Sequence, residues 1–100
     1  MTLIARRRYL VCYDIRDAKR LRRVFKCLQG FGDGLQYSVF YCELSPRNKV
    51  QLEAKLGDII NHKEDRVMIV DTGAVDATAK PTFEFMGQIT PVVGRHTVII

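Results

Sequence analysis

The apolar positions of this chain follow two periods, one typical of strands and the other typical of helices. Tyr9–Ile15 is apolar at every position except Asp14, which is typical of a strand covered on both faces. Apolar residues then recur at helical spacing from Ala18 to Leu28. Asp17 precedes them and can cap a helix, because its carboxylate can accept hydrogen bonds from the N–H groups of the first turn. The pattern therefore predicts a strand followed directly by an amphipathic helix.

A glycine-rich segment and a second β-rich segment come next. Gly30, Gly32 and Gly34 predict a turn, and we expect Gly30 or Gly32 to end the helix in a left-handed conformation. The stretch Leu35–Leu44 is rich in strand-forming residues. It predicts either one strand or a tight hairpin turning near Tyr37–Ser38. Residue chemistry does not choose between the two, because neither of these residue types is favoured in hairpin turns.

Helix signals return at Ser45, a capping residue, and at Pro46, which is favoured in a first helical turn. Apolar residues at helical spacing continue to Ile60, and we expect this helix to end near Asn61 or His62. A further strand is predicted at Arg66–Asp71 and a loop at Thr72–Thr82. Two short strands are predicted at Phe83–Met86 and Thr97–Ile100.

With the hairpin, the element order is βαββαβ plus a late extension, which predicts an α+β protein with a ferredoxin-like sandwich. We expect residues 1–100 to form one domain, with residues 83–100 as a C-terminal extension that adds a strand to its own sheet or to a partner's. Both helices would cover one sheet face. Tyr9–Ile15 and Arg66–Asp71 are apolar on both faces, so the sequence predicts that a second copy covers the other face in a face-to-face homodimer.

Positive charge is concentrated near the N-terminus. The chain carries a net charge of +5 with a pI of about 9.4. Six cations lie in and just before the first predicted helix: Arg16, Lys19, Arg20, Arg22, Arg23 and Lys26. No acidic residue follows them at i+4, so they repel one another unless an anion binds. We therefore favour binding of a nucleic-acid phosphate backbone over the alternative, a solvated helix face.

Asp14 is the candidate catalytic and metal-binding residue. A carboxylate at the end of a strand suits Mg²⁺, which one or two carboxylates and a substrate phosphate can hold. One aspartate per chain makes a sparse site, whereas two copies meeting across a twofold axis would supply two carboxylates. The alternative interpretation is structural, with Asp14 accepting hydrogen bonds from N–H groups of the following loop.

Other chemistry is not indicated. Cys12, Cys27 and Cys42 are odd in number and lack CxxC spacing, so they are expected to be free core thiols. No apolar run approaches the length of a membrane span, and the N-terminal arginines lead directly into a strand rather than a signal peptide. The sequence predicts a cytoplasmic protein that does not contact membranes.

The first 45 residues carry a specific resemblance. The strand ending in YDI, the helix beginning DAKRLRRV and the run LQYSVF closely resemble the second family of CRISPR-associated proteins (Cas-two), the small subunit of the spacer-acquisition complex. The later segments RVMIVDTG and FEFMG extend the resemblance over nearly the whole chain.

This resemblance implies a ferredoxin-like fold, a hairpin at Tyr37–Ser38, a homodimer and assembly with the larger CRISPR-associated integrase subunit. It also implies Mg²⁺-dependent endonuclease activity on RNA or DNA, resting on the aspartate that matches Asp14. The alternative within the same family is a non-catalytic DNA-binding scaffold that bridges integrase subunits during spacer acquisition. The two functions are not exclusive, and the resemblance supports both.

Overall fold

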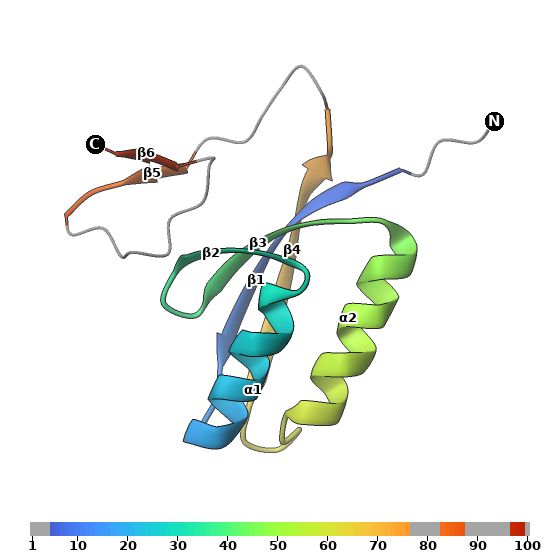
Figure 1. The fold of residues 1–100 in the computed structure, drawn as a ribbon, viewed down its shortest axis with the longest axis vertical. Helices are drawn as coiled ribbons and strands as arrows, with labels where there is room; N and C mark the ends of the chain where they lie inside the picture. The colour runs from blue at the N-terminus through green and yellow to red at the C-terminus, as the bar shows by residue number, and fades with distance from the viewer. Residues whose placement is uncertain (1–4, 77–82, 88–96, 100) are drawn as a thin grey trace.

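Two helices and a four-stranded sheet form the main body of the protein (Figure 1). The structure, a computed structural model, describes residues 5–76, 83–87 and 97–99. Its elements are β1 (Arg7–Asp14), α1 (Ala18–Gln29), β2 (Gly32–Gln36), β3 (Val39–Leu44), α2 (Pro46–Ile59), β4 (Arg66–Ala74), β5 (Phe83–Phe85) and β6 (Thr97–Ile99). The antiparallel sheet has the order β2-β3-β1-β4. This arrangement confirms the predicted α+β, ferredoxin-like fold.

Both helices lie against one face of the sheet, as Figure 1 shows, and the core lies between the two layers. Alternate residues of β1 point into this core, because successive side chains of a strand point to opposite faces. Tyr9, Val11 and Tyr13 are buried there beside Val24 of α1 and Leu52 of α2. The central strand is therefore fixed in register by large apolar side chains on the helix side.

Local capping signals set the starts of both helices as predicted. The Asp17 carboxylate accepts a hydrogen bond from the Arg20 N–H at 3.0 Å, and the Ser45 hydroxyl accepts one from the Asn48 N–H at 3.1 Å. The ends differ from the predictions. Gly30 follows α1 in a right-handed conformation, so no left-handed glycine ends this helix, and α2 ends at Ile59. Each cap N–H instead bonds to carbonyl groups of the last turn.

The hairpin exists, and Tyr37 and Ser38 form its turn, as the resemblance implied. Ser38 has a φ of 66°, a left-handed conformation that is uncommon for residues other than glycine. The glycine-rich segment was predicted wrongly as a turn, because Gly32 begins strand β2. Pairing with β3 makes this segment a strand, and glycine is needed there because the two backbones approach closely.

The close approach at Gly32 gives a stability prediction. A methyl group at this position would stand 2.6 Å from Cys42 Sγ and still nearer to the Tyr41 carbonyl oxygen. We expect Gly32→Ala to lower the free energy of unfolding by about 1–3 kcal/mol through overpacking. Gly57→Ala in α2 is the matched control, because nothing lies within 4 Å of its new methyl group. It should raise the free energy of unfolding by about 0.5–1 kcal/mol in the same urea titration, since alanine favours helix. Equal effects at both positions would contradict the steric explanation.

The opposite face of the sheet is partly apolar, and neither of the two helices in the described residues lies on it. Met68 and Val70 of β4 remain 53% and 37% exposed, and they pair with Cys12 and Leu10 of β1. At the other side of this face, Phe83 of β5 packs edge-on against Tyr41, with ring centroids 5.2 Å apart. β5 also lies beside Leu10 of β1, because Leu10 and Phe83 line one hollow. The apolar surface of β4 around Met68 and Val70, with the adjoining residues of β1, is called the open face below, and no helix or strand of the described residues packs on Met68 or Val70.

The late strands form a small sheet of their own. β5 pairs in parallel with β6, with Phe83 opposite Thr97, instead of extending the main sheet. β4 also runs three residues further than predicted, to Ala74, because its last residues pair with Arg7 and Arg8 of β1. The rest of the predicted loop, residues 77–82, lies outside the described residues.

Candidate nucleic-acid interface

Asp14 is the last residue of β1, and its exposed side chain lies on the open face of the sheet. Its Cα partner across the strand pair is Arg66 at the start of β4. In the described part of the chain, the Asp14 carboxylate makes no hydrogen bond or ion pair. Asp14 does end the strand, but the hydrogen bonds to local N–H groups that the structural alternative expects are not formed in the described residues. The carboxylate points to solvent and is accessible to a cation.

A different aspartate binds that loop. Asp65, just before β4, accepts hydrogen bonds from the backbone N–H groups of Arg16 at 2.9 Å and Asn61 at 2.8 Å. It also accepts from the Arg20 guanidinium, at 2.7 Å from Nε and 3.1 Å from Nη2. These donors hold the pKa of the Asp65 carboxyl well below its usual range, the Arg20 hydrogen bond being the largest cause. Asp65 thereby ties the loop after β1 to the loop before β4.

The six candidate cations have different environments. Arg16, Lys19, Arg22, Arg23 and Lys26 are exposed, and none forms an ion pair within the described residues. Arg20 is an exception, because its side chain is 23% exposed and contacts Asp65 at 2.7 Å and Glu64 at 3.7 Å. These acids are 44 and 45 residues away in the sequence, so no rule based on i+4 spacing could have found them. Arg20 joins the loops, while the other five cations face solvent.

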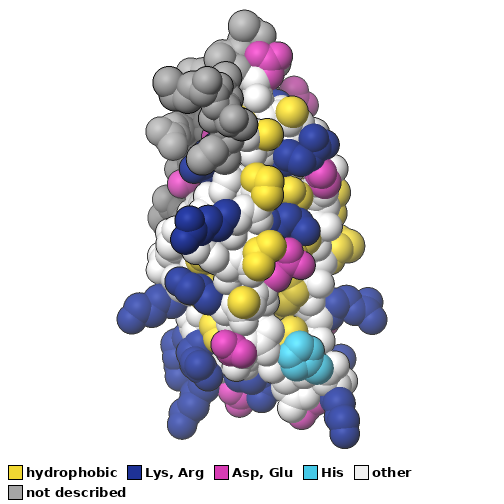
Figure 2. All heavy atoms as spheres, turned by 90° about the vertical axis from the view of Figure 1, so that its right-hand side faces the viewer, with side chains coloured by type: hydrophobic (Ala, Val, Ile, Leu, Met, Phe, Trp, Pro, Cys, Tyr) yellow, Lys and Arg dark blue, Asp and Glu magenta, His cyan; other side chains and the backbone are white. Residues whose placement is uncertain are grey.

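The cations extend away from Asp14 along α1. Arg16 and Lys19 lie at the end of the molecule where β1 finishes and α1 begins. Lys26 lies eight residues into the helix, about 12 Å along its axis from Ala18. Figure 2 shows Lys and Arg side chains standing out at this lower end and at the sides of the molecule. A long polyanion is thus a better match for the set than a single small anion.

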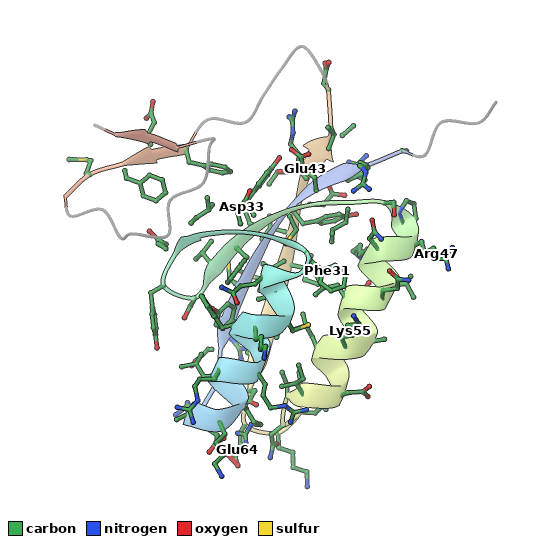
Figure 3. All side chains as sticks on the ribbon, in the orientation of Figure 1. Phe31, Asp33, Glu43, Arg47, Lys55 and Glu64 are labelled. Atoms are coloured by element: carbon green, nitrogen blue, oxygen red, sulfur yellow. The ribbon has the colours of Figure 1, made fainter. Side chains whose placement is uncertain are left out.

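A single chain offers few side chains that could together bind a metal ion. Within residues 5–76, 83–87 and 97–99, no group of three or more His, Cys, Asp or Glu side chains lies close enough to hold a metal ion. Asp33 and Glu43 lie at the end of the sheet opposite to Glu64 (Figure 3), and Glu43 accepts a hydrogen bond from the Tyr41 hydroxyl at 2.7 Å. Asp14 by itself therefore supplies one ligand in a single chain.

Two further predictions concern the cysteines and membranes. Cys12, Cys27 and Cys42 are free thiols, and Cys42 is buried in the core, where burial raises the pKa of its thiol to about 12. Among the described residues, neither helix is long and apolar enough to cross a bilayer.

Known proteins are similar to this chain in sequence and in fold. The family model described as CRISPR associated protein Cas2 matches residues 7–78. A CRISPR-associated endoribonuclease Cas2 from Geobacter sulfurreducens is 41% identical, over 92% of this chain and 96% of its own length. A CRISPR-associated endoribonuclease Cas2 from Rhodospirillum rubrum is 34% identical, over 92% and 89%. The crystal structure of Streptococcus pyogenes Cas2 superposes with a TM-score of 0.60 at 34% identity, covering 63% of this chain and 82% of that one.

Proposed function

Because this chain belongs to the family of CRISPR associated protein Cas2, we propose that it is a nucleic-acid-binding nuclease of a CRISPR system. RNA is the first substrate to test, since the relatives are named endoribonucleases. One observation carries the proposal. Asp14 presents an exposed carboxylate without a hydrogen-bond or ion-pair partner in the described residues, at the strand end that leads into the cations of α1. A free acid beside a phosphate-binding surface suits phosphodiester hydrolysis.

The proposal includes a homodimer formed through the open face. Met68 and Val70 are exposed at its centre, and Leu10 and Cys12 lie beside them on β1. Exposed apolar residues that are contiguous on a sheet face mark an interaction surface. A second copy is the simplest partner, because a twofold interface needs only a patch that complements itself. Asp14 lies on the same face, so pairing through it would bring the two copies of Asp14 to one interface.

Magnesium belongs to the same proposal. One carboxylate per chain does not make a metal site, whereas two copies of Asp14 and a substrate phosphate supply the oxygen ligands that Mg²⁺ prefers. When bound, such an ion would polarise the phosphodiester and lower the pKa of a bound water. The chain itself would supply the rest: exposed cations that position phosphates, and Asp65, which holds the loop that follows Asp14.

Binding through the phosphate backbone predicts a steep dependence on salt. With about four to six phosphates neutralised per dimer, log K should fall against log salt with a slope of roughly −4 to −5. Replacing both Arg22 and Arg23 by alanine should make this slope less steep by about 2 or more, because each copy loses two exposed cations. Fluorescence anisotropy with a labelled duplex across a salt series measures both slopes.

The control for this pair is Arg47→Ala with Lys49→Ala, which removes the same charge from the start of α2. Arg47 lies at the opposite end of the molecule from Glu64 (Figure 3), and Lys49 is already paired with Glu53 at 3.2 Å. This control should leave the slope within about 0.5 of the wild-type value. An equal change in both double variants would mean that net charge, and not the surface of α1, governs binding.

A second function has its own support. In the described part of one chain Asp14 lacks companion ligands, whereas five exposed cations are available to a nucleic acid. These facts also suit a non-catalytic scaffold that binds DNA and bridges copies of the larger integrase subunit during spacer acquisition. The scaffold needs the cations and the dimer, but it does not need the Asp14 charge. Substitution of Asp14 separates the two functions.

A further inference from the structure

A groove of about 590 Å³ lies between α1 and the β2–β3 hairpin. β1 contributes Tyr13 to it, α1 contributes Arg22, Phe25 and Lys26, and the hairpin contributes Gln36 and Tyr37. Tyr13 and Asp14 are successive residues of β1 and therefore point to opposite sheet faces. The groove is thus on the helix side of the strand end whose other side carries Asp14. The function proposed above uses the cations at its rim, Arg22 and Lys26, but not its aromatic walls.

Aromatic side chains form the walls of the groove. Phe25 is 37% exposed, and its ring is held edge-on against Phe40 with centroids 5.4 Å apart. Tyr37 is 79% exposed at the tip of the hairpin. Burial keeps the pKa of the Tyr13 phenol above its ordinary value, so this third ring stays neutral. The groove therefore offers apolar ring surfaces to a ligand.

The backbone fixes the position of Tyr37. The Tyr13 N–H donates a hydrogen bond to the Ser38 carbonyl at 3.1 Å, which joins the hairpin turn to β1. Ser38 holds the left-handed conformation that the two-residue turn requires. A rigid loop that presents an aromatic ring loses little conformational entropy when a ligand stacks on it.

The charges on the rim point to an anionic ligand. Arg22 and Lys26 are four residues apart on α1, so both lie on the side of the helix that borders the groove. Neither forms an ion pair in the described part of the chain, and the residues that line the groove include no acid. A ligand that complements this surface needs a flat apolar part for the rings and negative charge for the rim.

We propose that this groove binds an unpaired nucleobase of a nucleic acid, stacked against Tyr37 and Phe25, with the flanking phosphates on Arg22 and Lys26. A nucleotide combines a planar ring with a phosphate, which is the combination that the groove requires. A base inside a duplex is already stacked and paired, so the ligand is a single-stranded segment, such as an overhang or a flap. This inference rests on the proposed nucleic-acid binding and adds a preference for unpaired ends.

The test compares two oligonucleotides of equal length, a blunt duplex and a duplex with a short overhang that contains the fluorescent base 2-aminopurine. On the wild-type protein, the overhang should bind more tightly than the blunt duplex, and stacking should quench its fluorescence. Tyr37→Ala should weaken binding of the overhang by between about 5- and 150-fold and abolish the quenching, while binding of the blunt duplex stays within about twofold. Tyr37→Phe keeps the ring and should retain both signals.

Val50→Ala is the matched control, because Val50 is an exposed apolar residue on α2, 66% exposed, and it lines a different hollow from Tyr37. It should change neither affinity. If Tyr37→Ala binds both oligonucleotides as the wild type does, the groove inference is wrong and the proposed nucleic-acid binding stands. If the wild type binds neither oligonucleotide, the proposed function fails and the inference fails with it. A third outcome would indicate a protein ligand in the groove instead of a nucleobase. In that case the wild type binds both oligonucleotides equally well and binds an acidic, aromatic peptide tightly, and Tyr37→Ala abolishes binding of the peptide.

Discussion

Asp14→Asn is expected to reduce Mg²⁺-dependent cleavage of RNA by at least about a hundredfold while binding stays within about twofold of wild type. The amide keeps the size of the side chain but lacks the negative charge that a divalent ion needs. The fold should survive, because the Asp14 carboxylate makes no hydrogen bond or ion pair in the described residues. Labelled RNA incubated with Mg²⁺ or with a chelator measures cleavage, and thermal unfolding checks the fold.

Asp58→Asn is the matched control, since Asp58 is another exposed aspartate, on α2, and the chemical change is the same. Cleavage by this variant should equal that of the wild type. If the wild-type protein cleaves neither RNA nor DNA with Mg²⁺, the nuclease proposal fails. Spacer acquisition in cells gives the second readout. We expect it to survive Asp14→Asn and to fail when Arg22 and Arg23 are replaced, as a scaffold requires.

The second large effect concerns the open face. We expect the wild type to be a dimer at micromolar concentration and Met68→Lys to be a monomer there, with a dissociation constant raised by at least about a thousandfold. Met68 lies next to Cys12 on this face, so the dimer would bury one unpaired ammonium group from each copy, at a cost of several kcal/mol. Sedimentation velocity over a concentration series measures the change.

Val50→Lys is the control for added charge at an exposed apolar position, since Val50 lies on α2, outside the open face. This variant should remain a dimer. If two copies of Asp14 form one site, Met68→Lys should also lose cleavage although its own Asp14 is intact. A wild-type protein that sediments as a monomer at tens of micromolar would refute both the dimer and the paired carboxylates.

Features that depend on interactions between residues close together in the chain could be predicted from the sequence. The starts of both helices were predicted correctly, because Asp17 and Ser45 bond N–H groups only three residues away. The continuous apolar run from Tyr9 was sufficient to predict β1 for the same reason, since its strand-forming residues are adjacent in the chain itself. The family resemblance then identified the hairpin at Tyr37–Ser38, which residue chemistry alone had left open.

The segment after α1 shows the limit of local reasoning. Glycine is typical of turns, yet Gly32 pairs with β3 and is a strand residue. Since glycine has no side chain, the backbone here can approach Cys42 and Tyr41 closely. β5 and β6 are a similar case, since two short strands of a late extension carry no signal of which neighbour they pair with.

The candidate site divides in the same way. From the sequence alone, Asp14 and the cations of α1 could be identified as candidates, because residue type and helical spacing are local properties. Which of them are available to a ligand was decided by tertiary structure. Asp65 precedes β4, the neighbour of β1 in the sheet, and binds the Arg16 N–H and the Arg20 guanidinium, so Arg20 is engaged whereas Asp14 is not. Hydrogen bonds between residues 45 or more positions apart form only when β1 and β4 pair, so no pattern along the chain could have shown them.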